Sequence, residues 1–435
     1  MDFICYIWLM ILLFLRPGDF LRELDDIPLF WISSVVTLLF CFPKVMALMS
    51  SRSLRANAAL PLLLIVWMAF PLSHIAPGRV DFDRAYQAAN IFFKPMSFFI
   101  FTLAIVNTQR RLILVCRWIT FLAMILSALA IYDYHYQAFP GVFNHATEAS
   151  FDSPTGVILR LAGSGTLGDP NDYAVFLVFV SMLNFDPLLN RKLGLTRVIW
   201  LIPLVINVWA FALTQSRGAF LSLLAAVSTA LFLKFGVRRS MLPLVVVLPA
   251  LFASFGGRMT NLTLGGTTGQ ERIEYVGVCF DLIKKSPIFG IGYGETSAWL
   301  HGRVAHNTYM QTMAELGTIW GSVFALFLFL PLLQFIRMRP PRTRFLDPAM
   351  ARLYLFYGGC LAGFLVGILS LSRAEVLQTY LILGLGTAFG RIARREPPDP
   401  LPGFRVQTFG HILLAGFGVV LFHYLLLRYF YGVGI

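Results

Sequence analysis

The sequence is poor in charged residues and in cysteine, and each shortage excludes a class of protein. Asp, Glu, Lys and Arg make up only 13% of the 435 residues, whereas soluble domains contain about 25%. A water-soluble enzyme is therefore excluded. The five cysteines are scattered and include no CxxC pair, so they indicate neither a disulfide framework nor a zinc site.

Sequence signatures of nucleotide and metal binding are missing as well. The chain has no GxxxxGK[ST] phosphate loop, so ATP-driven transport by this chain alone is not expected. The seven histidines show no metal-ligand spacing such as HExxH. The glycine-rich run at 287–294 follows a predicted helix instead of a strand, which argues against a dinucleotide site. We expect this run to form a tight loop that packs on the membrane surface or lets a ligand approach its backbone.

Long apolar runs are what the sequence has in abundance. Hydrophobic residues make up 57% of the chain, and a spanning helix needs about 20 mostly apolar residues because its peptide groups find no water in the bilayer. The runs predict spans near residues 3–15, 27–43, 59–77, 88–106, 112–134, 172–186, 198–213, 219–233, 241–255, 307–332, 353–372, 375–390 and 408–427. The first run is short enough to be a half-span. The sequence therefore predicts an all-α, polytopic integral membrane protein of 12 or 13 transmembrane helices.

The basic charge of the chain is explained by its orientation in a membrane. The net charge is +13, and 20 of the 35 Lys and Arg residues lie in six loops that are cytoplasmic if the N-terminus is inside. Cytoplasmic loops are enriched in Lys and Arg, so the excess charge needs no nucleic-acid partner. The N-terminus has neither a basic segment nor a cleavage site, and we expect it to be a retained helix.

The chain divides into three expected regions. Residues 1–255 form an N-terminal bundle of about nine spans, and residues 307–435 form the C-terminal spans. Between them, 256–306 is a large outer, periplasmic loop. Apolar residues recur at helical spacing within 270–285 and predict an amphipathic helix there.

Ionisable residues at the outer membrane boundary are the first candidates for function, because charge is costly there. Arg217 lies in a turn at 214–218, where a guanidinium can hold phosphate oxygens in bidentate fashion. The alternative is an arginine that only extends to the interface. Arg272 stands at the start of the amphipathic helix, and the alternative for it is pairing with Glu271 or Glu274.

His306 stands where the outer loop enters the next span. Its imidazole has an ordinary pKa close to neutral and suits a general base. Asn307, Gln311 and Glu315 follow at a spacing of four and share a helix face, and Asn307 is also a candidate N-cap. A carboxylate nearly two turns inside an apolar helix is costly, which favours a functional role for Glu315 over pairing within the bundle.

These motifs resemble the O-antigen ligase/polymerase superfamily of bacterial membrane proteins. The resemblance lies in their order along the chain and in their location on the same side of the membrane. That family has an SRG turn, then an hP-x-x-G-x-G segment, then HN-x-x-x-x-x-x-x-E-x-G. The chain matches these patterns at 216–218, 286–294 and 306–317, after an outer PND segment at 170–172. The resemblance covers residues 160–335, and the earlier spans resemble the family only in hydrophobicity and number.

The resemblance implies a glycosyltransferase of the bacterial inner membrane that acts at the periplasmic face. The donor would be a glycan on undecaprenyl pyrophosphate, and the acceptor a lipid A-core, polysaccharide or protein hydroxyl, among membrane lipids. Arg217 and Arg272 would bind the pyrophosphate, and His306 would activate or orient the acceptor, with Glu315 in support. Neither a metal nor another cofactor is implied, because two arginines can stabilise the departing charge.

Further polar residues at the same boundary are expected to bind substrate, and each has a structural alternative. These residues are Ser216, Asn171, Asn307 and Arg373. The first three also suit the starts of helices. Arg373 has Glu375 two residues away as a pairing partner.

Two alternative functions stay open from the sequence. A polymerase of lipid-linked repeat units belongs to the same superfamily, and the large outer loop favours a ligase over it. A small-anion carrier of the bicarbonate type is a different class. A transporter should place charged sites near the bilayer midplane, whereas nearly all charge here lies at the outer boundary, with Arg117 as the main exception.

Overall fold

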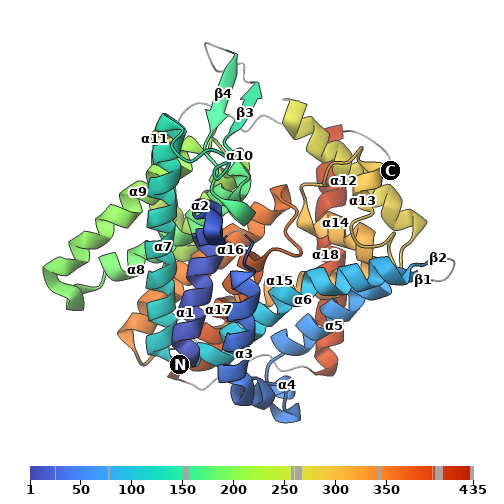
Figure 1. Ribbon diagram of the computed structural model, residues 1–435, viewed down its shortest axis with the longest axis horizontal. Coiled ribbons are helices and arrows are strands. Elements are labelled where there is room, and N and C mark those ends of the chain that lie inside the picture. The colour runs from blue at the N-terminus through green and yellow to red at the C-terminus, as the bar shows by residue number, and fades with distance from the viewer. Residues whose placement is uncertain are drawn as a thin grey trace.

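Helices make up most of the part of the chain that the computed structural model describes (Figure 1). The described residues are 1–24, 26–76, 79–149, 156–255, 259, 267–339, 344–393, 395–396 and 405–431. The sheets within these ranges are short and consist of two antiparallel strands each. The all-α class predicted from the sequence is therefore confirmed. In the expected outer loop, residues 256–258 and 260–266 lie outside the described residues.

The elements follow one another along the chain with short connections. The first helices are α1 (Asp2–Phe14), α2 (Pro17–Phe20), α3 (Leu29–Leu48), α4 (Ser51–Ala56), α5 (Ala59–Leu72), α6 (Phe82–Ile105) and α7 (Gln109–Tyr136). The middle helices are α8 (Pro170–Leu188), α9 (Leu201–Leu213), α10 (Arg217–Phe235), α11 (Val237–Ser254), α12 (Thr267–Lys285) and α13 (Thr296–Trp299). The last are α14 (Thr308–Leu316), α15 (Thr318–Arg337), α16 (Pro348–Gly367), α17 (Leu377–Ile392) and α18 (Val406–Tyr431). The strand pairs are β1 (Ile75–Ala76) with β2 (Arg79–Val80), β3 (Ala146–Ala149) with β4 (Val157–Arg160), and β5 (Arg344–Phe345) with β6 (Arg395–Glu396), the last pair joining strands that precede α16 and follow α17.

Within the described ranges, nine helical segments are long and apolar enough to cross a membrane. They are Leu29–Leu48, Phe82–Ile105, Gln109–Tyr136, Arg191–Leu213, Arg217–Phe235, Val237–Ser254, Thr318–Arg337, Pro348–Ser370 and Gln407–Tyr429. α1 and α5 are shorter apolar helices, and α8 and α17 occupy the remaining predicted spans. Every predicted span therefore overlaps a helix, because a long apolar run must satisfy its own peptide groups in a bilayer. The prediction at 59–77 runs too far, since α5 ends at Leu72 and β1 follows it.

The predicted span at 307–332 is wrong in one respect, because it is two helices instead of one. α14 ends at Leu316 and α15 begins at Thr318. Gly317, between them, has a φ of +86°. A Cβ on Gly317 would stand 2.2 Å from the carbonyl oxygen of Ile288, so the glycine-rich loop lies directly against the break.

The glycine-rich loop at 287–294 supplies the hydrogen bonds that the helix break leaves open. Helix ends expose carbonyl and amide groups without partners in the helix. Backbone bonds run from Ile291 N to Ala314 O (2.9 Å), from Gly292 N to Glu315 O (3.0 Å) and from Thr318 N to Pro287 O (2.8 Å). The predicted loop is confirmed as a loop, but the backbone that it approaches belongs to this helix break.

The close contact of α10 and α16 fixes the relative position of their ends. Ser222 Oγ donates to the carbonyl of Gly363 at 2.7 Å. A Cβ on Gly359 would stand 2.6 Å from the carbonyl oxygen of Ala226. Small residues allow such close approach of two helix backbones. The start of α10 is thereby held beside the end of α16.

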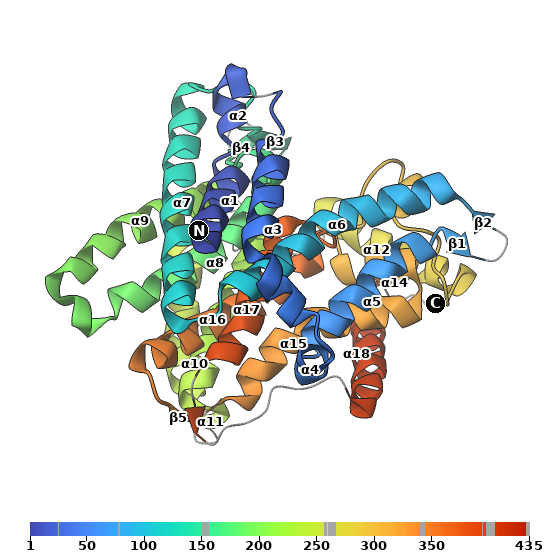
Figure 2. The same cartoon turned by 60° about the horizontal axis from the view of Figure 1, so that its bottom comes forward.

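The helix bundle has two distinct ends, which we call the upper face and the lower face after their places in Figure 1. The hairpin β3–β4 and α12 lie at the upper face, and α4 lies at the lower face (Figures 1 and 2). At the lower face, Asp2 contacts Lys44 at 2.5 Å and Arg111 at 3.3 Å, which ties α1, α3 and α7 together.

Candidate functional site

A cavity of about 420 Å³ at the upper face brings together five of the residues predicted from the sequence. These are Asn171, Arg217, Arg272, His306 and Asn307. The cavity is also lined by polar residues that were not predicted, namely Glu148, Arg160, Gln215, Ser370 and His423, and by apolar residues of α10, α12, α16 and α18. The residues come from segments far apart in the chain, so the cavity is a product of the tertiary fold.

Two arginines reach the cavity from separate helices. Arg217 is the first residue of α10, and Arg272 lies near the start of α12. The apolar stripe of α12, predicted from its spacing, is buried at Ile273 and Val276, which fixes this helix over the bundle. Glu271, a possible partner of Arg272, contacts Arg303 at 3.1 Å.

His306 is half-buried in the cavity lining and is strained in its backbone. Its φ is +49°, and Gln215, which lines the same cavity, has a φ of +51°. Non-glycine residues with such angles are uncommon and cluster at functional sites. The pKa of His306 is lowered from its ordinary value because burial disfavours the charged imidazole, and the positive charges of Arg272 and Arg303 lower it further. His306 is therefore neutral and able to accept a proton at neutral pH.

Three helices begin at the cavity, each with a side-chain cap. Asp169 Oδ1 accepts from Asn171 N at 2.8 Å at the start of α8. Ser216 Oγ accepts from Ala219 N at 3.3 Å at the start of α10. Asn307 caps α14 in the same way. Helix N-termini carry partial positive charge, so their convergence favours an anion in the cavity.

Arg160 of β4 connects three of the segments around the cavity. Its side chain is buried and donates to Thr214 O at 2.9 Å, to Asn171 Oδ1 at 2.7 Å and to Glu148 Oε2 at 2.9 Å. Asn171 Oδ1 also accepts from Ser216 Oγ at 2.9 Å. Ser216, although absent from the lining, thus helps to hold Asn171 in place.

Glu315 and Arg373 were predicted to belong to the site, but neither is among the residues that line the cavity. The buried carboxylate of Glu315 accepts from Thr296 Oγ1 and, at 3.0 Å, from Gln311 Nε2. The contact with Thr296 ties α14 to α13. The bond from Gln311, within α14, confirms that Gln311 and Glu315 share a helix face.

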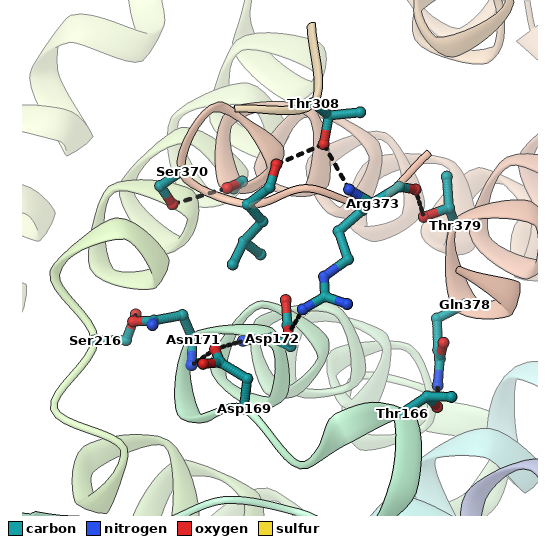
Figure 3. A network of polar contacts seen from close by, with 12 residues as sticks. Thr166, Asp169, Asn171, Asp172, Ser216, Thr308, Ser370, Arg373, Gln378 and Thr379 are labelled. Carbon is teal, nitrogen blue, oxygen red and sulfur yellow. Dashed lines mark hydrogen bonds and ion pairs between the residues drawn. The ribbon is translucent and has the colours of Figure 1, made fainter. Parts of the chain in front are cut away.

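Arg373 is absent from the cavity lining and forms an ion pair with Asp172 (Figure 3). Its backbone N donates to Thr308 Oγ1 at 2.9 Å, and Thr379 Oγ1 donates to its carbonyl at 3.0 Å. The ion pair is thus with Asp172 of α8 and not the expected local one with Glu375. This network joins α8, α14 and α17 next to the cavity residues Asn171 and Asn307.

An apolar groove of about 440 Å³ continues from the cavity between α10, α15, α16 and α18. Four residues line both spaces: Val366, Leu369, Phe422 and His423. The polar cavity and the apolar groove therefore meet along α16 and α18.

No group of three His, Cys, Asp or Glu side chains suited to a metal ion occurs in the described ranges. The polar groups around the cavity are instead mainly arginine, asparagine and histidine, with one carboxylate, Glu148, already bonded to Arg160. The expectation of a metal-independent site remains a prediction.

Comparison with known proteins bears on the segment that supplies the two arginines and His306. Residues 202–330 match the family model described as O-antigen ligase, and no curated protein matches the chain. Asn171, Arg160 and His423 lie outside the matched segment. The match confirms the resemblance seen in the sequence: residues 202–330 of this multi-pass membrane protein are similar to the O-antigen ligase family.

Proposed function

We propose that the chain transfers a glycan from an undecaprenyl-pyrophosphate carrier to an acceptor hydroxyl at the periplasmic face of the bacterial inner membrane. The observation that carries this proposal is the junction of a polar cavity holding Arg217, Arg272 and His306 with an apolar groove. A lipid pyrophosphate has the same two parts, an anionic head and a long hydrocarbon chain.

The electrostatics of the cavity suit the head of such a donor. Guanidinium groups hold phosphate oxygens in bidentate fashion and stay charged at all relevant pH values. The N-termini of α8, α10 and α14 add partial positive charge at the same place. Together, these groups would stabilise the negative charge that develops on the departing pyrophosphate.

The reaction requires one base and one leaving group. The acceptor hydroxyl oxygen attacks the anomeric carbon of the donor sugar and forms the new glycosidic bond. The bond from that carbon to the pyrophosphate oxygen breaks, and its electron pair leaves with the pyrophosphate. The hydroxyl proton passes to neutral His306, for which an imidazole is the appropriate base. The reaction written in this way consumes no ATP and uses no metal ion.

Glu315 and Arg373 act in this proposal as positioning residues and not by contact with substrate. Glu315 fixes α14 through Thr296 and Gln311. Arg373 holds Asp172, which follows the cavity residue Asn171 in the chain. Both would thereby fix the helix N-termini that surround the anion.

The family match and the position of Arg117 favour an enzyme over an anion carrier. Arg117, the main charged exception within the spans, pairs with Asp186 at 3.9 Å, and Asp186 also contacts Arg352 at 3.4 Å. An arginine paired with the buried carboxylate of Asp186 is accounted for without a transport site. We propose a ligase, with a lipid A-core, polysaccharide or protein acceptor.

Transfer by the purified chain tests the proposal directly. The protein is incubated with an undecaprenyl-pyrophosphate oligosaccharide and each candidate acceptor. We expect Arg217→Ala and His306→Ala each to lower the rate by about 100-fold or more, the first by removing a group that stabilises the departing charge and the second by removing the general base. Arg191→Ala and His411→Ala, both exposed and outside the cavity lining, serve as controls. A single shift of the acceptor identifies a ligase and a ladder of products a polymerase, whereas no transfer by folded wild type contradicts the proposal.

A further inference from the structure

A second groove lies between α3 and α6 and shares no lining residue with the cavity of the candidate site. Its volume is about 210 Å³. Its walls are mainly apolar and aromatic, from Phe30 and Trp31 at one end of α3 to Val45 toward the other. Lys94 of α6 is the one charged residue among the described residues that line it.

The contact of Lys94 with α3 shows where Lys94 lies between the upper and lower faces. Lys94 lies near the middle of α6, but α6 runs obliquely to α3 and α7 in both views (Figures 1 and 2). The Lys94 ammonium lies 5.9 Å from the ring centre of Trp31, close to the start of α3. Lys44, toward the other end of α3, contacts Asp2 at the lower face. At 1.5 Å per residue, Trp31 is about 20 Å above Lys44, so the ammonium stands at the upper end of the groove.

The surroundings of the Lys94 ammonium favour the binding of an anion. Lys94 is exposed at the side of the bundle, and no carboxylate pairs with it among the residues that the structure describes. The ammonium lies over the Trp31 ring, and tryptophan is enriched at the boundary between hydrocarbon and headgroups. A lysine at this boundary attracts anionic lipid headgroups.

We propose that the groove between α3 and α6 binds an anionic phospholipid, with its phosphate at Lys94 and an acyl chain along the apolar wall toward Val45. The groove extends over most of the length of α3, which matches a chain that descends from a headgroup at its upper end. One lysine suits a singly charged phosphodiester, whereas the cavity of the candidate site presents two arginines. The inference does not rest on the proposed transfer reaction.

Retention of lipid by the purified full-length protein tests the inference. The protein is equilibrated with equal amounts of phosphatidylglycerol and phosphatidylethanolamine in detergent, and bound lipid is measured by native mass spectrometry. We expect phosphatidylglycerol to be retained in preference, and Lys94→Gln to weaken its binding by about fivefold, the effect of one lysine at an anionic surface. Lys234→Gln is the matched control, because Lys234 also lies over an aromatic ring, that of Phe235 at 4.8 Å, but does not line this groove.

A second variant tests the apolar part of the groove separately. Ser34 lines the groove, and Ser34→Phe fills it while leaving Lys94 in place. We expect this variant to lose phosphatidylglycerol as Lys94→Gln does. Equal retention of the two lipids by the wild type, or unchanged binding in both variants, would overturn the inference. When a polyprenyl pyrophosphate is added in equal amount, a loss of that lipid instead of phosphatidylglycerol in Lys94→Gln and Ser34→Phe would also overturn it.

Discussion

Asn307 joins α14 to the last helix of the chain, because its side-chain amide donates to Nε2 of His423 at 2.9 Å. The Oδ1 atom of Asn307 accepts from Met310 N at 3.1 Å and caps α14. His423 Nδ1 donates to the carbonyl of Val419 at 2.8 Å, which leaves Nε2 as the acceptor. The residue that follows His306 is thus anchored by a helix outside the segment that matches the O-antigen ligase family.

We expect His423→Ala to lower kcat by about tenfold, the upper range for loss of one buried hydrogen bond, with little change in KM for the donor. The buried amide of Asn307 would lose its partner, and the backbone at His306 would lose its support. His423→Gln supplies an amide oxygen as acceptor and should restore part of the rate. His411→Ala on the same helix is the control. A kcat equal to wild type in His423→Ala would show that the hydrogen bond does not position His306.

Arg160 should contribute to stability as well as to the geometry of the cavity. Arg160→Met removes the bonds to Thr214, Asn171 and Glu148 and leaves the Glu148 carboxylate without this partner. We expect a loss of about 3 kcal/mol in the free energy of unfolding, the lower end for a broken buried pair, because Glu148 is partly exposed. Thermal unfolding of the solubilised protein measures the change. The double variant Arg160→Met/Glu148→Gln should recover part of it, and no recovery would argue that the ion pair is unimportant.

The pH dependence of transfer should report the lowered pKa of His306. The neutral imidazole is the active form, and protonation as the pH falls through this lowered pKa removes the base. Activity should therefore persist below the ordinary histidine range and decline only at more acidic pH. Arg272→Gln removes a positive charge that lowers this pKa, so the acid limb should move to higher pH. A limb unchanged by Arg272→Gln, or still present in His306→Ala, would assign the titration to another group.

Most of the spans and most of the site follow from local features of the sequence. An apolar run forms a helix in a bilayer without help from distant residues, and the helix at 270–285 shows its stripe directly. Arg217, Arg272 and His306 were found because each stands in a short polar motif beside an apolar run. Motifs at a common membrane level can meet once the helices pack, and here they do.

The parts that sequence reasoning missed depend on distant partners. Arg160 is in no recognisable motif, and its partner Thr214 lies 54 positions later in the chain. His423 is 116 positions from Asn307. The break at Gly317 was also missed, since the apolar pattern continues from α14 into α15 and the loop that fills the break lies elsewhere in the sequence.

Gly290 should be intolerant of any side chain, because its backbone packs against the break between α14 and α15. Its φ is +68°, and an added Cβ would stand 2.1 Å from the carbonyl oxygen of Glu315. Since that neighbour is backbone held by the loop itself, Gly290→Ala should cost about 3 kcal/mol of stability, as overpacking at a strained position does. Gly277→Ala is the matched control, because Gly277 lies within α12 with no atom within 4 Å of an added Cβ. Alanine is favoured over glycine in a helix, so this control should keep or raise the unfolding midpoint. Equal unfolding midpoints for the two variants would mean that the loop can move away from the break. The packing of the loop against Glu315, which supports α14, would then be lost.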